Sequence, residues 1–418
     1  MNNFTGANFL RQRLVLSTIT GQELNIRSIR SDDILNKGLN EAETSLLHLL
    51  DKVTDGSSFK ISESGTSLYY RPGIIIGGGT RQIPIIHKCH PSRALSYYIE
   101  FLLMICLFGK NPLTIKLEGS TDNSGVDHSI DIIRMVTIPL IQKLSGITEE
   151  FSLKINRRSV SPSSSGSVLL NIPIMKKIEP IIMSGDVGRV KRIRGIVWYT
   201  GATSNQITMK MISKARSVLN RFIPDVWIYN DQPKIDSSNN QEENTGFGMT
   251  LISETLKGVI KGADFSFSSN SNNLQEILDL QSHYSEDEVK DDSELKVEDD
   301  VTDISDDVFH FDDDIENMTE WERIGWLTAT RLLLEIDSQS LVDTGHQIYT
   351  LLFMALSQDS SKSELKLSKL TPMSVQFLRD LKLFTNVEFD IKEDFENGGI
   401  IILSCTGIGL PNFARKAV

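Results

Sequence analysis

Residues 117–135 read LEGSTDNSGVDHSIDIIRM and bring together residue types that could bind a divalent metal ion. The candidate ligands in this stretch are Glu118, Asp122, Asp127, Asp131 and His128. Converging carboxylates can hold the metal ions that assist hydrolytic reactions. The same acids also suit the first turns of a helix, where Asp122 or Asp127 could be the cap and a negative charge meets the positive end of the helix dipole. The spacing leaves a metal site and a structural role both open.

Other motifs have suitable residue types but lack the spacing that chemistry requires. IHKCH at residues 86–90 has no second Cys/His pair to complete a zinc site. The glycine run at residues 71–80 lacks the Gly-Lys-Ser/Thr of a phosphate-binding loop and predicts a turn between strands. Beside His346, we expect Asp343 or Thr344 to cap a helix rather than to assist catalysis. These motifs predict no bound metal and no cofactor.

The elements that would position these residues alternate between strands and helices, which indicates a mixed α/β protein. Helices are predicted over residues 41–53, 91–108, 127–144, 206–222, 320–336, 347–356 and 374–384. Strands are predicted over residues 115–117, 153–155, 168–174, 195–200, 225–229, 248–255, 387–391 and 400–405, with a strand pair in 59–70. The 418 residues are too many for one ordinary domain.

Charge is distributed unevenly along the chain, whose formal net charge is −12. Residues 286–316 hold sixteen acidic residues and two lysines, so the remainder has 41 basic and 39 acidic residues. Residues 268–316 run from Asn/Ser-rich to acidic, a composition that predicts disorder. In the slightly basic remainder, clusters at residues 154–158 and 189–194 could contact the phosphates of a nucleic acid.

Cysteine content and apolar run length indicate the compartment. The three cysteines are too few for a disulfide framework and favour a reducing environment. The N-terminal residues do not have the pattern of a secretory signal, and the longest apolar run, residues 99–108, is too short to span a bilayer. We expect a soluble intracellular protein that has no contact with a membrane.

Five segments, taken in order, resemble the RNA 3′-terminal phosphate cyclase family. They begin RLVLSTITGQELNIRS, YYRPGIIIGG, GSTDNSGVDHSIDIIRM, VDTGHQIYTLLFMALSQ and LTPMSVQFLRDLKLF. The resemblance implies an α/β fold (an α+β sandwich) with three similar units, each a four-stranded sheet with two helices, and a smaller inserted α/β domain. On this basis we expect two units in residues 1–187, the insert in 188–319 and the third unit in 320–418.

This chain departs from the family where the cyclase chemistry would take place. The true cyclases adenylylate a histidine and use the AMP to activate an RNA 3′-phosphate. The resemblance places Met373 at the position of that histidine, and no histidine lies within residues 347–418. The family's N-terminal acid falls on Phe4, and its acid–glutamine pair falls on Ile348 and Tyr349. We therefore predict no catalytic residue and no cyclase activity.

The resemblance then points to the cyclase-like branch, which acts in the nucleolus on early pre-rRNA processing toward 18S rRNA. It implies binding to a ribosome-assembly GTPase, to pre-rRNA and to components of the small-subunit processome. The expected GTPase-binding residues are Arg379, Asp380 and Lys382. The expected RNA- or anion-binding residues are Arg11, Arg157, Arg158, Lys191, Arg192 and Arg194. Two alternatives remain: a metal-dependent pre-rRNA endonuclease that uses the acids of 118–131 or Asp380, and an active cyclase.

Overall fold

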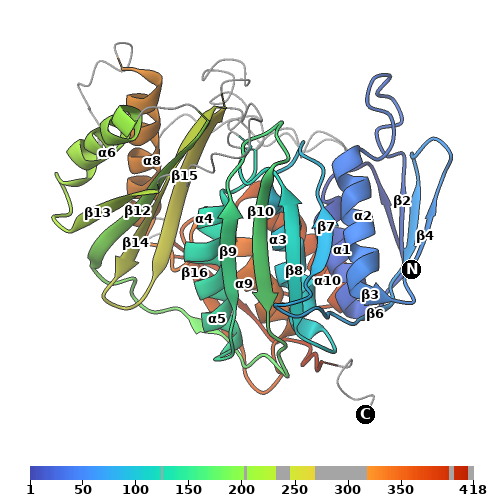
Figure 1. Cartoon of the computed structure of the whole chain (residues 1–418). Coiled ribbons are helices and arrows are strands. Elements are labelled where there is room, and N and C mark those ends of the chain that lie inside the picture. The colour runs from blue at the N-terminus through green and yellow to red at the C-terminus, as the bar shows by residue number, and fades with distance from the viewer. Residues whose placement is uncertain (124–125, 202–204, 232–244, 269–317, 395–399, 413–418) are drawn as a thin grey trace.

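The structure is a computed structural model that describes residues 1–123, 126–201, 205–231, 245–268, 318–394 and 400–412. Its strands form four four-stranded sheets and one small two-stranded sheet. Figure 1 shows the sheet formed by strands within residues 190–268, with helices α6 Asn205–Leu219 and α8 Glu320–Asp337, to the left of the rest of the molecule. The α/β fold predicted from the sequence is confirmed. The segment predicted to be disordered lies almost wholly outside the described residues.

Three of the sheets belong to units of one design, strand–helix–strand–helix–strand–strand. The first unit contains β1 Asn2–Thr5, α1 Leu10–Thr20, β2 Leu24–Arg27, α2 Glu41–Val53, β4 Ser58–Ile61 and β5 Leu68–Arg71. The second contains β7 Ile85–Lys88, α3 Leu95–Ile105, β8 Leu113–Gly119, α4 Ile130–Ile132, α5 Ile138–Ser145, β9 Ser152–Arg157 and β10 Gly166–Ile172. The third contains β11 Ile182–Met183, α9 Gln347–Leu356, β16 Ser363–Leu367, α10 Pro372–Thr385, β17 Asp390–Asp394 and β18 Ile400–Cys405. The small sheet pairs β3 Thr54–Asp55 with β6 Ile74–Ile75.

Strand pairing is the same in these three units. The first strand runs parallel to the second, and the fourth lies antiparallel between the second and third, as in the order β7-β8-β10-β9. The inserted unit contains β12 Val190–Thr200, α6 Asn205–Leu219, β13 Val226–Asp231, β14 Gly246–Thr255, β15 Ile260–Ser268 and α8 Glu320–Asp337. Its strand order is β13-β12-β14-β15, so its chain path differs from that of the three units.

The packing of α8 bears on where the insert ends. This helix lies against α6, β14 and β15, and its buried residues Ile324 and Leu332 belong to the core of the inserted unit. At the other end, β11 pairs with β16 of the third unit. The domain boundaries expected from the sequence, which place the insert in 188–319, stay a prediction. From this packing we propose that α8 belongs to the insert and β11 to the third unit. The insert then lies between the first strand and the first helix of the third unit.

The helices form where their sequences supply both a cap and an apolar face. The side chain of Asn40 accepts a hydrogen bond from the Glu43 amide at 2.7 Å, and Glu43 bonds back to the Asn40 amide. This capping box begins α2, the helix predicted over 41–53. At α4 the cap is Ser129, which accepts from the Ile132 amide at 3.2 Å, so the expectation that Asp122 or Asp127 caps this helix was wrong. From α4 the chain passes through a π-helical turn, Ile133–Thr137, into α5.

The largest core is shared among the three units. Every residue of α3 and of α9 is buried, and Figure 1 shows these two helices behind the sheet β7-β8-β10-β9. Large side chains such as Tyr98, Phe101 and Phe353 fill this core, and each stabilises the fold by about 1.5–3 kcal/mol or more when fully buried. The inserted unit has a separate core under its two helices. Within the described ranges, no helix is long and apolar enough to cross a bilayer.

Candidate functional site

Met373 lies where the N-terminal end of α10 meets α1. Thr371 begins α10, because its hydroxyl accepts a hydrogen bond from the Ser374 amide at 3.1 Å. Met373 is half-buried against the main core, and its sulfur accepts a weak hydrogen bond from Gln12 Nε2 over 3.7 Å. A thioether has no nitrogen with which to form a phosphoramidate, so this side chain can pack but cannot carry AMP as a histidine does.

Asp380, one of the three expected partner-binding residues, is buried rather than exposed. Its Oδ2 lies 3.2 Å from Arg13 Nε, and the two side chains are 1% and 9% exposed. Gln376 Nε2 donates to its other oxygen at 3.0 Å. Burial raises the pKa of the Asp380 carboxyl, and Arg13 opposes that shift. The expectation that Asp380 is a surface charge was wrong, because this carboxylate anchors α10 to α1.

Arg379 and Lys382 lie on the exposed side of the same helix. Arg379 Nη1 approaches Gln376 Oε1 at 3.4 Å, and Lys382 Nζ lies 2.9 Å from Glu388 Oε1. Exposed ion pairs of this kind contribute about 0–1 kcal/mol to stability. These two cations are therefore accessible to a partner, and their role in binding stays a prediction.

Arg11, expected to bind an anion, is engaged by a protein carboxylate. Its Nη1 lies 2.8 Å from Glu100 Oε2 and donates to the Tyr97 carbonyl at 3.1 Å, with 14% of the Arg11 side chain exposed. Its guanidinium also lies 4.7 Å from the centre of the Tyr97 ring. Nearby, the hydroxyl of Tyr349 is buried without a hydrogen-bond partner among the described residues. An anion would have to compete with Glu100 for Arg11.

Three of the acids in residues 118–131 have cations of their own. Glu118 pairs with Lys116 at 2.7 Å, and Asp127 accepts two hydrogen bonds from Arg93 Nε at 3.0 and 2.9 Å. Asp131 pairs with Arg134 at 2.7 Å and also with Arg158. Within the described ranges, no three His, Cys, Asp or Glu side chains form a group that could hold a metal ion. The converging carboxylates that a two-metal nuclease requires are not found there.

Asp122 is the exception among these acids. Its carboxylate is 1% exposed and has no hydrogen-bond partner among the described residues. Burial raises its pKa to about 7, against the influence of Arg158. The carboxyl therefore gains or loses its proton near neutral pH inside the protein.

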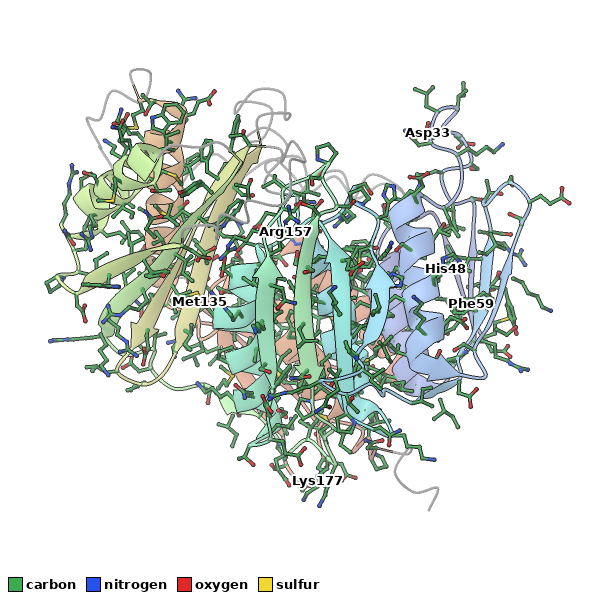
Figure 2. The ribbon with its side chains drawn as sticks, viewed as in Figure 1. Asp33, His48, Phe59, Met135, Arg157 and Lys177 are labelled. Carbon is green, nitrogen blue, oxygen red and sulfur yellow. The ribbon has the colours of Figure 1, made fainter. Side chains whose placement is uncertain are left out.

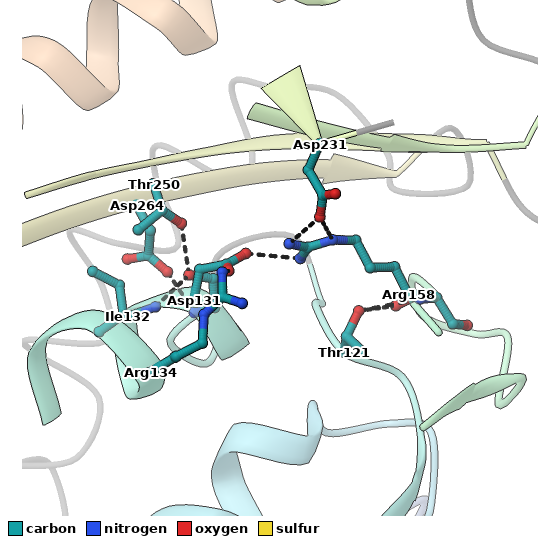
Figure 3. Close-up of polar contacts among 10 residues, drawn as sticks. Thr121, Asp131, Ile132, Arg134, Arg158, Asp231, Thr250 and Asp264 are labelled. Carbon is teal, nitrogen blue, oxygen red and sulfur yellow. Dashed lines mark hydrogen bonds and ion pairs between the residues drawn. The ribbon is translucent and has the colours of Figure 1, made fainter. Parts of the chain in front are cut away.

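Arg158, expected to contact RNA, links the inserted unit to the second unit (Figure 3). Its Nη1 donates to Asp131 Oδ2 at 2.7 Å, and its Nη2 donates to Asp231 Oδ2 of β13 at 2.8 Å. The side chain is 9% exposed. Ser129 and Thr250 add a second link between the two units, with their hydroxyls 2.9 Å apart. The geometry makes Arg158 a structural clamp, so the expectation that it is a surface phosphate contact was wrong.

His346, His128 and His87 have structural partners. His346 Nδ1 contacts the carboxylate of Asp343, its Nε2 lies 2.7 Å from Thr137 Oγ1, and its ring stacks on that of His128. Of the two expected caps, Asp343 occupies the N-cap position of the 3-10 turn Thr344–His346, although its side chain makes no cap hydrogen bond there. In IHKCH, His87 Nε2 lies 3.1 Å from Ser45 Oγ, and burial lowers the pKa of His87 to about 4.

The remaining basic residues lie on the strands β9 and β12. Arg192 Nε donates to Glu254 at 2.6 Å, and Arg194 forms two hydrogen bonds with the carboxylate of Asp225, at 2.8 and 3.1 Å. Lys191 is exposed and Arg157 is half-buried. Lys191, Arg192 and Arg194 thus remain at the surface of the insert, where RNA binding stays a prediction for them and for Arg157.

Comparison with known proteins supports the resemblance over the whole chain. The family model described as RNA 3′-terminal phosphate cyclase matches residues 2–391. This chain belongs to the RNA 3′-terminal phosphate cyclase family. The resemblance inferred from the five segments is thereby confirmed.

Curated relatives cover almost the full length of the chain. The mouse RNA 3′-terminal phosphate cyclase-like protein is 34% identical over 418 residues, which is 99% of this chain and 97% of the relative. A probable cyclase-like protein of Arabidopsis thaliana is 35% identical over 417 residues, 100% of this chain and 99% of the relative. The rRNA processing protein rcl1 of Schizosaccharomyces pombe is 32% identical over 417 residues, with 100% and 98% coverage.

Several structurally important residues were not identified from the sequence. Arg13 pairs with Asp380, which lies 367 positions away, and Asp231 and Asp264 reach the second unit from the insert. No local pattern indicates such pairs. Trp227 and Tyr229 carried a usable signal, because the alternation in β13 places two aromatic residues on the side of the strand opposite the buried Ile228.

Proposed function

We propose that this chain is an rRNA-processing factor that acts by binding and not by cyclase chemistry. The observation that carries the proposal is its full-length relationship to the rRNA processing protein of Schizosaccharomyces pombe. In this role it works in the nucleolus, within the small-subunit processome, in early steps toward 18S rRNA. The match covers 98% of that relative, which supports the same kind of work for this chain. Its removal from cells is expected to cause unprocessed pre-rRNA to accumulate.

The side chain at position 373 supports the loss of cyclase chemistry. Met373 contacts Gln12 and the main core, and no imidazole from residues 347–418 can replace it. We expect no covalent AMP adduct when the full chain is incubated with ATP and magnesium, under conditions in which an active cyclase of the family forms one. An acid-labile adduct on this chain would contradict the proposal.

The exposed cations of α10 are the proposed contact for a ribosome-assembly GTPase. Arg379 can form a bidentate contact with a carboxylate of that partner, while the buried Asp380 holds the helix in place. Truncation of such a contact costs about 2 kcal/mol or more, so we expect Arg379→Ala to weaken binding about thirtyfold or more. Titration calorimetry with the GTPase measures this change, and the melting temperature should stay the same.

Lys362→Ala is the matched control for this measurement. Lys362 belongs to the same unit, is 62% exposed and pairs with Asp390 at 3.1 Å, as Lys382 pairs with Glu388. Its replacement should leave the affinity for the GTPase unchanged. Equal affinities for wild type and Arg379→Ala would remove α10 from the partner surface.

A further inference from the structure

Two large aromatic side chains of the inserted unit are open to solvent on one strand. Trp227 is 63% exposed and Tyr229 is 59% exposed, whereas Ile228 between them is buried in the core of the insert. Because side chains alternate along a strand, the two rings share the face of the sheet that is turned away from α6 and α8. They stand about 7 Å apart along β13, two residues of a strand.

Cationic side chains accompany these rings on the neighbouring strand. In the parallel register of β12 and β13, Arg194 lies opposite Trp227, and Ile196 lies opposite Tyr229. Arg192 lies on the same face as Arg194, and Lys191 is exposed beside it. The carboxylates of Asp225 and Glu254 orient the two guanidinium groups, whose side chains are still 32% and 38% exposed. A row of donors for phosphate thus runs beside a row of aromatic faces.

This face continues toward the second unit. Asp231 follows Trp227 and Tyr229 in the same alternation and bonds to Arg158, the clamp between the two units (Figure 3). Beyond the clamp, β9 carries the exposed Lys154 and ends at Arg157, which Figure 2 places at the upper end of the central sheet. Basic side chains are therefore present along β12 and again on β9, with the aromatic pair on the strand whose last residue, Asp231, reaches the junction.

We infer that this face of the insert binds single-stranded RNA, with bases stacked on Trp227 and Tyr229 and phosphates along the cations of β12. The inference rests on the proposed function and assigns a binding surface to it. Stacking of successive bases on exposed rings of an open sheet, beside a basic track, is a recurring way to hold single strands. Lysine is depleted at protein interfaces, and here Lys191 is exposed on β12, the strand beside the two rings.

The test is fluorescence anisotropy of the full chain with a labelled uridine oligonucleotide of about ten nucleotides, a length suited to one such surface. We expect Trp227→Ala and Tyr229→Ala each to weaken binding about tenfold, since one base–aromatic stack contributes about that much. Trp227→Phe should retain most of the affinity because it keeps a ring. Arg194→Gln should weaken binding and reduce the slope of log affinity against log salt by about one.

Phe222→Ala is the matched control, since Phe222 is a 56% exposed aromatic residue of the same unit outside β13. It should bind the oligonucleotide like the wild type, and all variants should keep the wild-type melting temperature.

If wild type binds but the Trp227 and Tyr229 variants bind equally well, the inference is overturned and the rRNA-processing role stands. If wild type does not bind, the inference is likewise overturned. If the variants instead lose the assembly GTPase while keeping RNA, the face is a protein interface. Unchanged pre-rRNA in depleted cells would overturn the proposed function without altering the binding result.

Discussion

The ion pair between Arg13 and Asp380 holds α10, with its exposed cations, against α1. In Asp380→Ala the Arg13 guanidinium, 9% exposed, would remain buried without its carboxylate. Removal of one partner from a buried pair costs about 3–5 kcal/mol, and the Gln376 amide would lose an acceptor as well. We expect the free energy of unfolding to fall by about 4 kcal/mol. Urea unfolding followed by circular dichroism measures the change. Tryptophan fluorescence would not report on this ion pair, because all four tryptophans lie in β12, β13 and α8.

Two companion variants make this prediction specific. Arg13→Met combined with Asp380→Leu should recover most of the loss, since well-packed apolar residues can replace a buried ion pair at little cost. Lys362→Met, which breaks the exposed pair with Asp390, should cost about 0–1 kcal/mol. If Asp380→Ala cost no more than Lys362→Met, the carboxylate would not be the anchor described here, and Asp380 would again be a candidate for partner contact.

Three further perturbations test the junction between the insert and the second unit. Burial raises the pKa of Asp122 to about 7, so the folded protein binds this proton more tightly than the unfolded chain, and stability falls as pH rises from about 4 to about 7. Asp122→Asn should therefore be more stable than wild type at about pH 8, by at most about 4 kcal/mol, with no gain near pH 4 in urea unfolding. Arg158→Met should leave the carboxylates of Asp131 and Asp231 without their shared cation and accelerate amide hydrogen exchange in β13, whereas unchanged exchange would show that Arg158 is not a clamp. Gly262→Val should loosen the junction, because a Cβ at Gly262 would meet Ile132 Cδ1 at 2.6 Å and the shorter, branched side chain of Val136 at 2.8 Å; amide hydrogen exchange in β15 identical to wild type would contradict this.

Many of the regular elements were predictable because local sequence determines them, but α1 and several short strands, among them β2, β7 and β16, were missed. The helix over 41–53 followed from its apolar spacing, and its Asn40–Glu43 capping box has a sequence signature. β15 was missed although Ala263, Phe265 and Phe267 alternate along it, a signal that was present in the sequence. The assignment of α8 could not be read locally, because an amphipathic helix does not specify which sheet it covers.

The candidate site was predictable only in part. Chemistry that depends on residue type, such as the absence of an imidazole at Met373, could be judged from the sequence. The exposure of charged side chains could not be judged from the sequence. The charges of Asp380, Arg158 and Arg11 are satisfied by residues far away in the chain. Charged clusters in a sequence look alike whether they end at the surface or in buried ion pairs. Strand pairing, which brings Arg194 beside Trp227, also emerges only from the fold.

The most direct test of the central claim is the pre-rRNA profile of cells depleted of this chain, measured by hybridisation to precursors of 18S rRNA. A processing factor that acts without cyclase chemistry predicts that early precursors accumulate and 18S rRNA declines. Re-expression of the wild-type chain should restore processing, and so should a Gln12→Ala variant, which removes the contact to the sulfur of Met373 at the lost nucleophile position. Normal levels of precursors and of 18S rRNA after full depletion would contradict the account.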